Sequence, residues 1–164
     1  ARAVEPPGGI ERAREADVVL AERLGELIAQ EGWVLLTGGR NAGVMAAAVR
    51  GAKRVPASLT VGILPTESGS MAPGLDIPIF TGLGNARNAI NVLSSHVVIT
   101  CGRLSSGTTS EAALALKVGR PLVLLSPSRE AETFFTALRR SVQVAQSPEE
   151  AIAIVKRVLA PSAA

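Results

Sequence analysis

Two glycine-rich stretches contain most of the residues that could bind an anionic group. The first, TGGRNAGVM, covers residues 37–45, and the second, CGRLSSGTTSE, covers residues 101–111. Each follows a short apolar run and precedes a segment of helical composition, so each should offer glycine backbone and the free N–H groups of a helix start to a phosphate. The predicted binding residues in these two loops are Thr37, Gly38, Gly39, Arg40, Gly43, Gly102, Ser106, Gly107 and Thr108.

Arg87 and Glu111 are the charged residues that could act on such a ligand. Arg87 stands near the start of a predicted helix, where the helix dipole does not favour a cation, so we expect an anionic partner for it. Glu111 is predicted in the first helical turn after the second loop, where capping alone would explain a carboxylate. If the two meet, Arg87 would bind phosphate, and Glu111 would orient the loop or serve as a general acid/base in glycosidic cleavage. A salt bridge from Arg87 to a surface acid is the structural alternative.

The elements that must position these residues alternate along the chain. Short apolar runs such as WVLLTGG, LTVGILP, VVITC and PLVLLS are separated by segments of helical composition. This alternation predicts an α/β fold of the Rossmann-like, doubly wound kind, with a mostly parallel sheet and helices on both faces. Pro78 predicts an edge position for the DIPIFTG strand. One domain should span residues 1–164, with residues 1–9 and 160–164 frayed. Because such sheets bind ligands at the carboxyl ends of their strands, both loops should face one crevice.

Composition limits the classes of function. The chain has 164 residues, 47% of them hydrophobic and 2% aromatic, and a formal charge of +3. So few aromatic residues leave no stacking platform for nucleic acid, and no apolar run approaches the length of a membrane span. A single cysteine and a single histidine predict neither a disulfide nor a metal site, and favour a cytoplasmic protein. We expect Cys101 to be a buried, unreactive thiol and His96 to lie on the surface.

Three blocks of sequence resemble a known family. LLTGGRNAGVMAAAVRGAK, DIPIFTGLGNARNAINVLSSHVVI and GTTSEAALALKVGRPLVLL look like the molybdenum cofactor carrier proteins, within the Lonely Guy (lysine decarboxylase-like) phosphoribohydrolase superfamily. The resemblance implies a Rossmann-like fold, a homo-oligomer (dimer or tetramer), molybdopterin-type cofactor bound as cargo, and a molybdoenzyme as recipient. It also implies an apolar first strand, which the opening ARAVEPPGG lacks.

The superfamily leaves two further functions open. Its hydrolase branch releases free base from a nucleoside 5′-monophosphate, and the motif positions of that branch fall on Arg87 and Glu111, which would then be catalytic. The loop GRLSSGT has Arg103 and Leu104 where both branches have glycine-rich sequence. A nucleotide-sensing regulatory module is the third hypothesis. We prefer a carrier-like protein that binds a small phosphorylated heterocycle without turnover.

Overall fold

The computed structural model describes residues 14–160 and confirms the alternation of strands and helices. The helices are α1 (Glu15–Gln30), α2 (Gly43–Ala52), α3 (Asn88–Leu93), α4 (Ser106–Lys117), α5 (Arg129–Leu138) and α6 (Pro148–Leu159), with a 3₁₀ turn η1 (Gly84–Arg87) before α3. The strands are β1 (Leu35–Thr37), β2 (Thr60–Leu64), β3 (Ile77–Phe80), β4 (Val98–Cys101), β5 (Leu122–Leu125) and β6 (Gln143–Ala145). The predicted frayed ends lie outside the described residues, apart from Ala160 at the end of α6. The question of a first strand lies outside them too.

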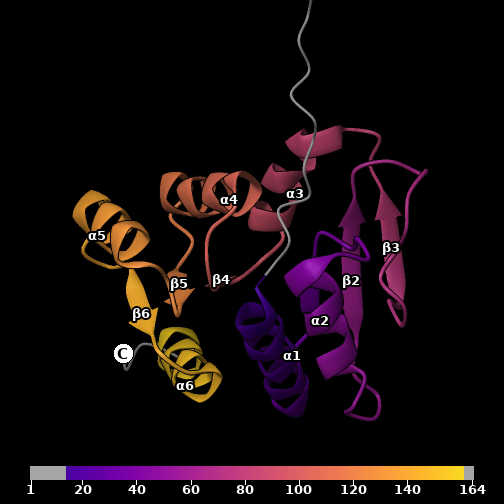
Figure 1. Ribbon diagram of the computed structural model, residues 1–164, viewed down its shortest axis with the longest axis horizontal. Coiled ribbons are helices and arrows are strands. Elements are labelled where there is room, and N and C mark those ends of the chain that lie inside the picture. The colour runs from indigo at the N-terminus through magenta and orange to yellow at the C-terminus, as the bar shows by residue number, and fades with distance from the viewer. Residues whose placement is uncertain (1–13, 161–164) are drawn as a thin grey trace, which may run out of the picture.

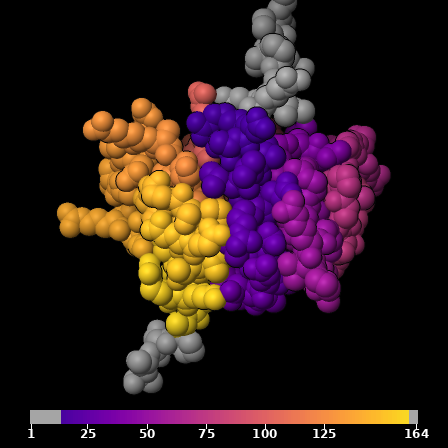
Figure 2. Space-filling view, turned by 60° about the horizontal axis from the view of Figure 1, so that its bottom comes forward, coloured from indigo at the N-terminus to yellow at the C-terminus, as the bar shows by residue number. Residues whose placement is uncertain are grey.

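All strand pairs are parallel, but they form two sheets where one was predicted. β1, β2 and β3 make one three-stranded sheet, and β4, β5 and β6 make the other. Between residues 14 and 160, no ladder joins β1 to β4. Helix α1 packs on both α2 and α6, and it lies between the two halves in Figures 1 and 2. Helix α1 therefore links the two sheets. The alternation of strands and helices along the sequence is the same for two sheets as for a single sheet, so it could not predict this division.

Helices cover both faces of the second sheet, as predicted. The side chains of β5 alternate between two core clusters: Val123 and Leu125 pack with α1 and α6, whereas Leu122 and Leu124 pack with α4 and Phe135 of α5. All four residues of β5 are buried, as expected for the central strand of a parallel sheet. In the first sheet, β3 pairs with β2 and with no other strand of residues 14–160, which confirms the edge position predicted from its proline.

Helices α1 and α2 pack closely, which fixes the end of the first glycine loop. A Cβ atom at Gly25 would overlap the carbonyl oxygen of Ala48, and one at Gly51 would overlap that of Glu22. The two helix backbones therefore touch, which only glycine permits at these positions. Because α2 begins at Gly43, this contact also holds the end of the first loop. None of the helices within the described residues is long and apolar enough to cross a bilayer.

Candidate functional site

Arg87 lies between the two glycine loops and is buried. It ends η1, its residue exposure is 8%, and its Nη1 lies 3.5 Å from Oε1 of Glu111. Its guanidinium also packs on the first loop, since a Cβ at Gly38 would lie 2.6 Å from Nη2. The Nε of Arg87 is buried without a hydrogen-bond partner among the described residues. Gly38, Arg87 and Glu111, which were predicted from separate stretches of sequence, therefore lie together in the fold.

Glu111 is held by two side chains. Its Oε1 accepts a hydrogen bond from Nδ2 of Asn91 at 2.7 Å and faces Arg87 through the same oxygen. The expectation that Glu111 lies in the first helical turn is wrong. Ser105 caps α4 by accepting the N–H of Thr108, so the helix begins at Ser106 and Glu111 falls in its second turn. Helix capping therefore does not explain this carboxylate, and its contacts are with the neighbouring helix and η1.

Positive charge exceeds negative charge around Arg87. Burial lowers the pKa of Arg87, the nearby charge of Arg40 lowers that pKa further, and Glu111 opposes both effects. Arg40 is exposed and forms no ion pair within residues 14–160. Arg87 therefore pairs with one carboxylate, that of Glu111, while the charge of Arg40 nearby has no such partner within residues 14–160. Such an arrangement is stabilised when an anion joins it.

Asn88 joins α3 to the start of α4. Its Nδ2 donates to Oγ of Ser110 at 2.8 Å and approaches the carbonyl oxygen of Gly107 at 3.5 Å. The predicted binding residues Ser106, Gly107 and Thr108 form the first turn of this helix. Thr108 uses its backbone N–H for the cap, and its hydroxyl lies 3.1 Å from Oγ of Ser105. This turn thus offers helix-start N–H groups beside the cluster of Gly38, Arg87 and Glu111, called the Arg87 cluster below. Among the serine and threonine side chains expected to cap the helix, it is Ser105 that does so.

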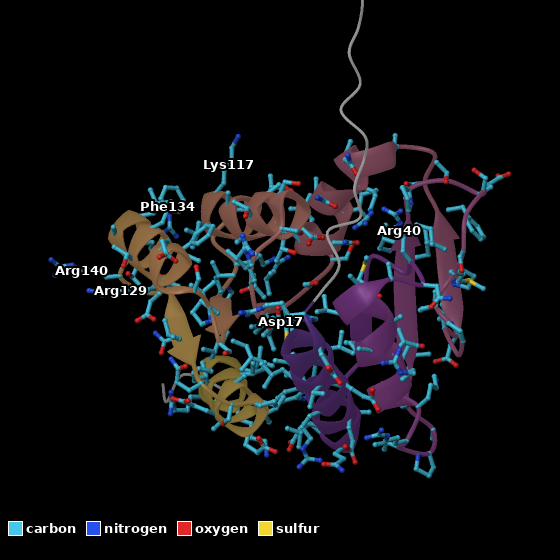
Figure 3. The ribbon with its side chains drawn as sticks, viewed as in Figure 1. Asp17, Arg40, Lys117, Arg129, Phe134 and Arg140 are labelled. Carbon is cyan, nitrogen blue, oxygen red and sulfur yellow. The ribbon has the colours of Figure 1, made fainter. Side chains whose placement is uncertain are left out.

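Asp17 supports the second loop and was missed by sequence reasoning. It lies near the start of α1 (Figure 3), is 3% exposed, and accepts the backbone N–H of Arg103 at 3.3 Å. Arg14 pairs with its other oxygen at 2.8 Å. Gly102 has a φ of +70°, and any side chain there would overlap the Asp17 carboxylate. Glycine at 102 is therefore required by the backbone and by Asp17, whether or not a ligand approaches it.

Cys101 and His96 lie as expected. The Cys101 thiol is partly buried and donates to the carbonyl oxygen of Asp17 at 3.6 Å. Burial raises the pKa of this thiol to about 12, with a smaller contribution from the charge of Asp17. The thiol is therefore protonated at neutral pH and unreactive. His96 is exposed. Within the described residues, no three His, Cys, Asp or Glu side chains gather to hold a metal ion.

The first loop is braced by its own residues and by the segment after β2. Oγ1 of Thr37 accepts the N–H of Gly39 at 3.0 Å. The N–H of Asn41 donates to the carbonyl of Ser70 at 2.8 Å, and that of Ala72 donates to Gly39 at 2.9 Å. Gly39 lies against β2, where a Cβ would come within 3.0 Å of Leu64 Cγ.

A cavity of about 380 Å³ opens between this loop and residues 65–70. Ten residues line it: Arg40, Asn41, Ala42, Leu64, Pro65, Thr66, Ser68, Gly69, Ser70 and Asn85. Of the predicted binding residues, only Arg40 lines this cavity. Figure 3 shows Arg40 beside β2. The remaining lining residues belong to no recognised motif, so no sequence pattern pointed to them.

Comparison with known proteins extends these observations. A family model described as the SLOG cluster4 family matches residues 7–152. The molybdenum cofactor binding protein of Rippkaea orientalis is 50% identical, with a TM-score of 0.87 over 91% of each chain. The molybdenum cofactor carrier protein of Chlamydomonas reinhardtii is 48% identical, with a TM-score of 0.85 over 91% of this chain and 92% of that one. An uncharacterized protein of Archaeoglobus fulgidus is 41% identical over 133 residues, 81% of either chain. The resemblance predicted from the three sequence blocks is confirmed.

Proposed function

The chain belongs to the SLOG cluster4 family, and on that basis we propose that it carries molybdenum cofactor as cargo, bound around Arg87. Structures that are 48–50% identical over about nine tenths of both chains are molybdenum cofactor binding or carrier proteins. The observation that carries the proposal in this molecule is Arg87 itself. A buried guanidinium whose Nε has no partner among the described residues, next to a second cation and a single carboxylate, is suited to binding an anionic group.

The terminal phosphate of the cargo would bind at Arg87. Gly38 leaves room for the guanidinium, which can offer N–H donors in a planar fork to phosphate oxygens. In the first turn of α4, Ser106 and Gly107 would add backbone N–H groups and the positive end of the helix dipole, and Thr108 would hold the turn through its bond to Ser105. Arg40 would supply the second positive charge. Gly43 and Thr37 would act indirectly, by ending and bracing the first loop.

Glu111 would act as a positioning residue in a carrier. Asn91 and Arg87 both contact its Oε1, so the carboxylate orients the guanidinium that faces the phosphate. A carrier needs no group that changes its protonation state during binding. The contacts of Glu111 are sufficient for this role, and no reaction step is required to explain them.

Transfer of cargo to a molybdoenzyme tests this proposal. The protein would be loaded with molybdenum cofactor under exclusion of oxygen, separated from free cofactor, and mixed with a cofactor-free molybdoenzyme whose recovered activity is measured. We expect the wild type to restore activity and Arg87→Ala to restore little. The exposed Arg129 on α5 provides the matched control, Arg129→Ala, which should behave as wild type. Circular dichroism would establish that both variants are folded. Equal transfer by Arg87→Ala and wild type would contradict the proposed site.

A nucleoside 5′-monophosphate phosphoribohydrolase is the second candidate, because Arg87 and Glu111 meet at 3.5 Å. In that reaction, the bond between ribose C1′ and the base breaks, water adds to C1′, and the base leaves with a proton. Glu111 would act on the water or stabilise positive charge on the ribose, while Arg87 held the phosphate.

A chromatographic assay separates the two candidates. The protein would be incubated with AMP, GMP, CMP and UMP, alongside Glu111→Gln and the control Glu132→Gln on α5. Base release that disappears only in Glu111→Gln would establish the hydrolase and overturn the carrier proposal. Absence of release from all four nucleotides would support the carrier.

We further propose that the protein is a cytoplasmic homo-oligomer, a dimer or tetramer, that delivers cargo to a molybdoenzyme. Exposed apolar side chains support self-association: Ile77, Ile79 and Phe80 on β3 are each more than 40% exposed, as are Phe134 and Leu138 on α5. Light scattering coupled to gel filtration would give the molar mass. A monomer at micromolar concentration would contradict this part of the proposal.

A further inference from the structure

The cavity between the first glycine loop and residues 65–70 is too large for a phosphate alone. Its volume of about 380 Å³ falls in the usual range for small-molecule sites, roughly 300–1,000 Å³. We infer that this cavity binds the fused ring of the cargo, with the side-chain amides of Asn41 and Asn85 contacting the hydrogen-bonding edge of the ring. The inference rests on the function proposed above, and it names a part of the site that the sequence motifs do not include.

Two residues that line the cavity, Asn85 and Arg40, lie near Arg87. Asn85 lines the cavity and lies two residues before Arg87 in η1. Arg40 also lines the cavity, and its charge is close enough to lower the pKa of Arg87. A ligand whose phosphate contacts Arg87 can therefore extend its ring past Arg40 into the cavity.

The lining of the cavity has the mixture that a polar heterocycle requires. Ala42, Leu64 and Pro65 offer apolar surface to the faces of a ring. The polar residues of the lining are Arg40, the two asparagines, Thr66, Ser68 and Ser70. Among the described residues, no carboxylate lines the cavity, and Glu67 of the same loop does not face it. A ring that is neutral or negatively charged is therefore favoured over a cationic one.

The asparagines around the site divide into two pairs. The amides of Asn88 and Asn91 are used inside the protein, by Ser110 and Glu111. Asn41 and Asn85 line the cavity, and their side-chain amides make no hydrogen bond within the described residues. An amide presents a donor beside an acceptor, and the pyrimidine edge of a pterin presents adjacent N–H and C=O groups. Asn41 and Asn85 are thus free to pair with that edge.

The cavity wall is held in place without a ligand. The N–H of Asn41 donates to Ser70, and residues 40 and 71 form an antiparallel bridge. Within the wall, the hydroxyl of Thr66 donates to the carbonyl of Ser68. A wall with these internal contacts loses little conformational freedom on binding, which favours affinity.

Calorimetry with three probes tests the inference. Neopterin monophosphate joins a pterin ring to a phosphate through a three-carbon chain, glycerol 3-phosphate retains only chain and phosphate, and pterin retains only the ring. Wild-type protein should bind neopterin monophosphate more tightly than either fragment. The double variant Asn41→Ala/Asn85→Ala should lose about five- to 150-fold in affinity for neopterin monophosphate, the loss of two hydrogen bonds, and keep its affinity for glycerol 3-phosphate. Gln30→Ala, at the exposed end of α1, is the matched amide control and should bind as wild type.

The outcomes separate this inference from the proposed function. If the double variant binds neopterin monophosphate as tightly as wild type, or loses both phosphate ligands equally, the ring does not contact these amides and the inference is overturned, while the phosphate site at Arg87 stands. If wild-type protein binds neither phosphate ligand, the proposed function fails and the inference fails with it. Thermal unfolding of the double variant would show whether the cavity wall is still folded.

Discussion

Replacing Gly38 with alanine should weaken anion binding by displacing Arg87. The added Cβ would lie 2.6 Å from Nη2 and 2.8 Å from Nη1, whereas ordinary contacts begin at 3.4 Å, so the guanidinium must move by about 0.8 Å (3.4 − 2.6). A shift of that size breaks well-aligned hydrogen bonds to a bound phosphate. Loss of one charge-assisted hydrogen bond costs about 1.5–3 kcal/mol, which corresponds to a loss of about 10- to 150-fold in affinity.

The same substitution should change stability little. Atoms close to the new Cβ are the ends of flexible side chains, Arg87 and the Sδ of Met45 at 2.8 Å, and these can move. The φ of Gly38 is outside the left-handed region, so alanine is not strained there. Alanine also restricts the unfolded chain, which stabilises a protein by about 0.4–1 kcal/mol. We expect the free energy of unfolding to stay within about 1 kcal/mol of wild type.

Calorimetric titration with neopterin monophosphate, paired with urea unfolding, provides the assay. Gly32→Ala is the control because Gly32 has a φ of +71° and a Cβ there would have no neighbouring atom within 4 Å, so alanine strains the backbone without touching the site. The control should lose about 1 kcal/mol of stability and retain its affinity. Wild-type affinity in Gly38→Ala would refute the reasoning that Arg87, packed on Gly38, is the phosphate-binding group.

Three further predictions concern the scaffold. Burial raises the pKa of Cys101 from 9.0 to about 12, so its thiolate fraction near pH 8 is lowered by about 1,000-fold. Iodoacetamide should therefore label Cys101 only after unfolding, and rapid labelling of the folded protein would contradict this. Gly25→Ala should lower the free energy of unfolding by about 3 kcal/mol or more in urea titrations, because the added Cβ would overlap the backbone of Ala48 and force α1 and α2 apart. A loss below about 1 kcal/mol would show that the two helices do not touch. The hydrogen bond from Lys53 lowers the pKa of Asp76 from 3.8, so this carboxylate stabilises the fold above pH 3.8 and the effect is lost as the pH falls through the lowered value. Asp76→Asn should therefore reduce the urea midpoint at pH 7 and hardly change it at pH 2, and equal losses at both would exclude the carboxylate charge as the cause.

Local patterns predicted the elements and the central cluster. Apolar runs such as that of β5 indicate buried parallel strands, and glycine loops after such strands indicate the carboxyl edge of the sheet. Because both loops were expected at one crevice, the meeting of Gly38, Arg87 and Glu111 followed from topology. The family resemblance pointed to the same residues.

Features that depend on tertiary packing could not be predicted in this way. Asp17 looks like an ordinary acid in the first turn of an amphipathic helix, and only the placement of α1 against the second loop buries it. The position of Glu111 within α4 was misjudged because the stretch before Ser110, rich in glycine, serine and threonine, has the composition of a loop, whereas Ser105 caps the helix and its first turn begins at Ser106. Asn41 and Asn85 lie 44 residues apart and share a cavity only because residues 65–70 fold over the first loop.

Retention of cofactor by the purified protein tests the central claim most directly. Wild type and Arg87→Ala would each be mixed with molybdenum cofactor without oxygen and passed through a desalting column, and the pterin and molybdenum eluting with the protein would be quantified. We predict about one pterin and one molybdenum per wild-type chain, since each chain holds one Arg87 cluster, and a small fraction of that for the variant. Wild-type protein that elutes free of pterin, or equal retention by both proteins, would contradict the account.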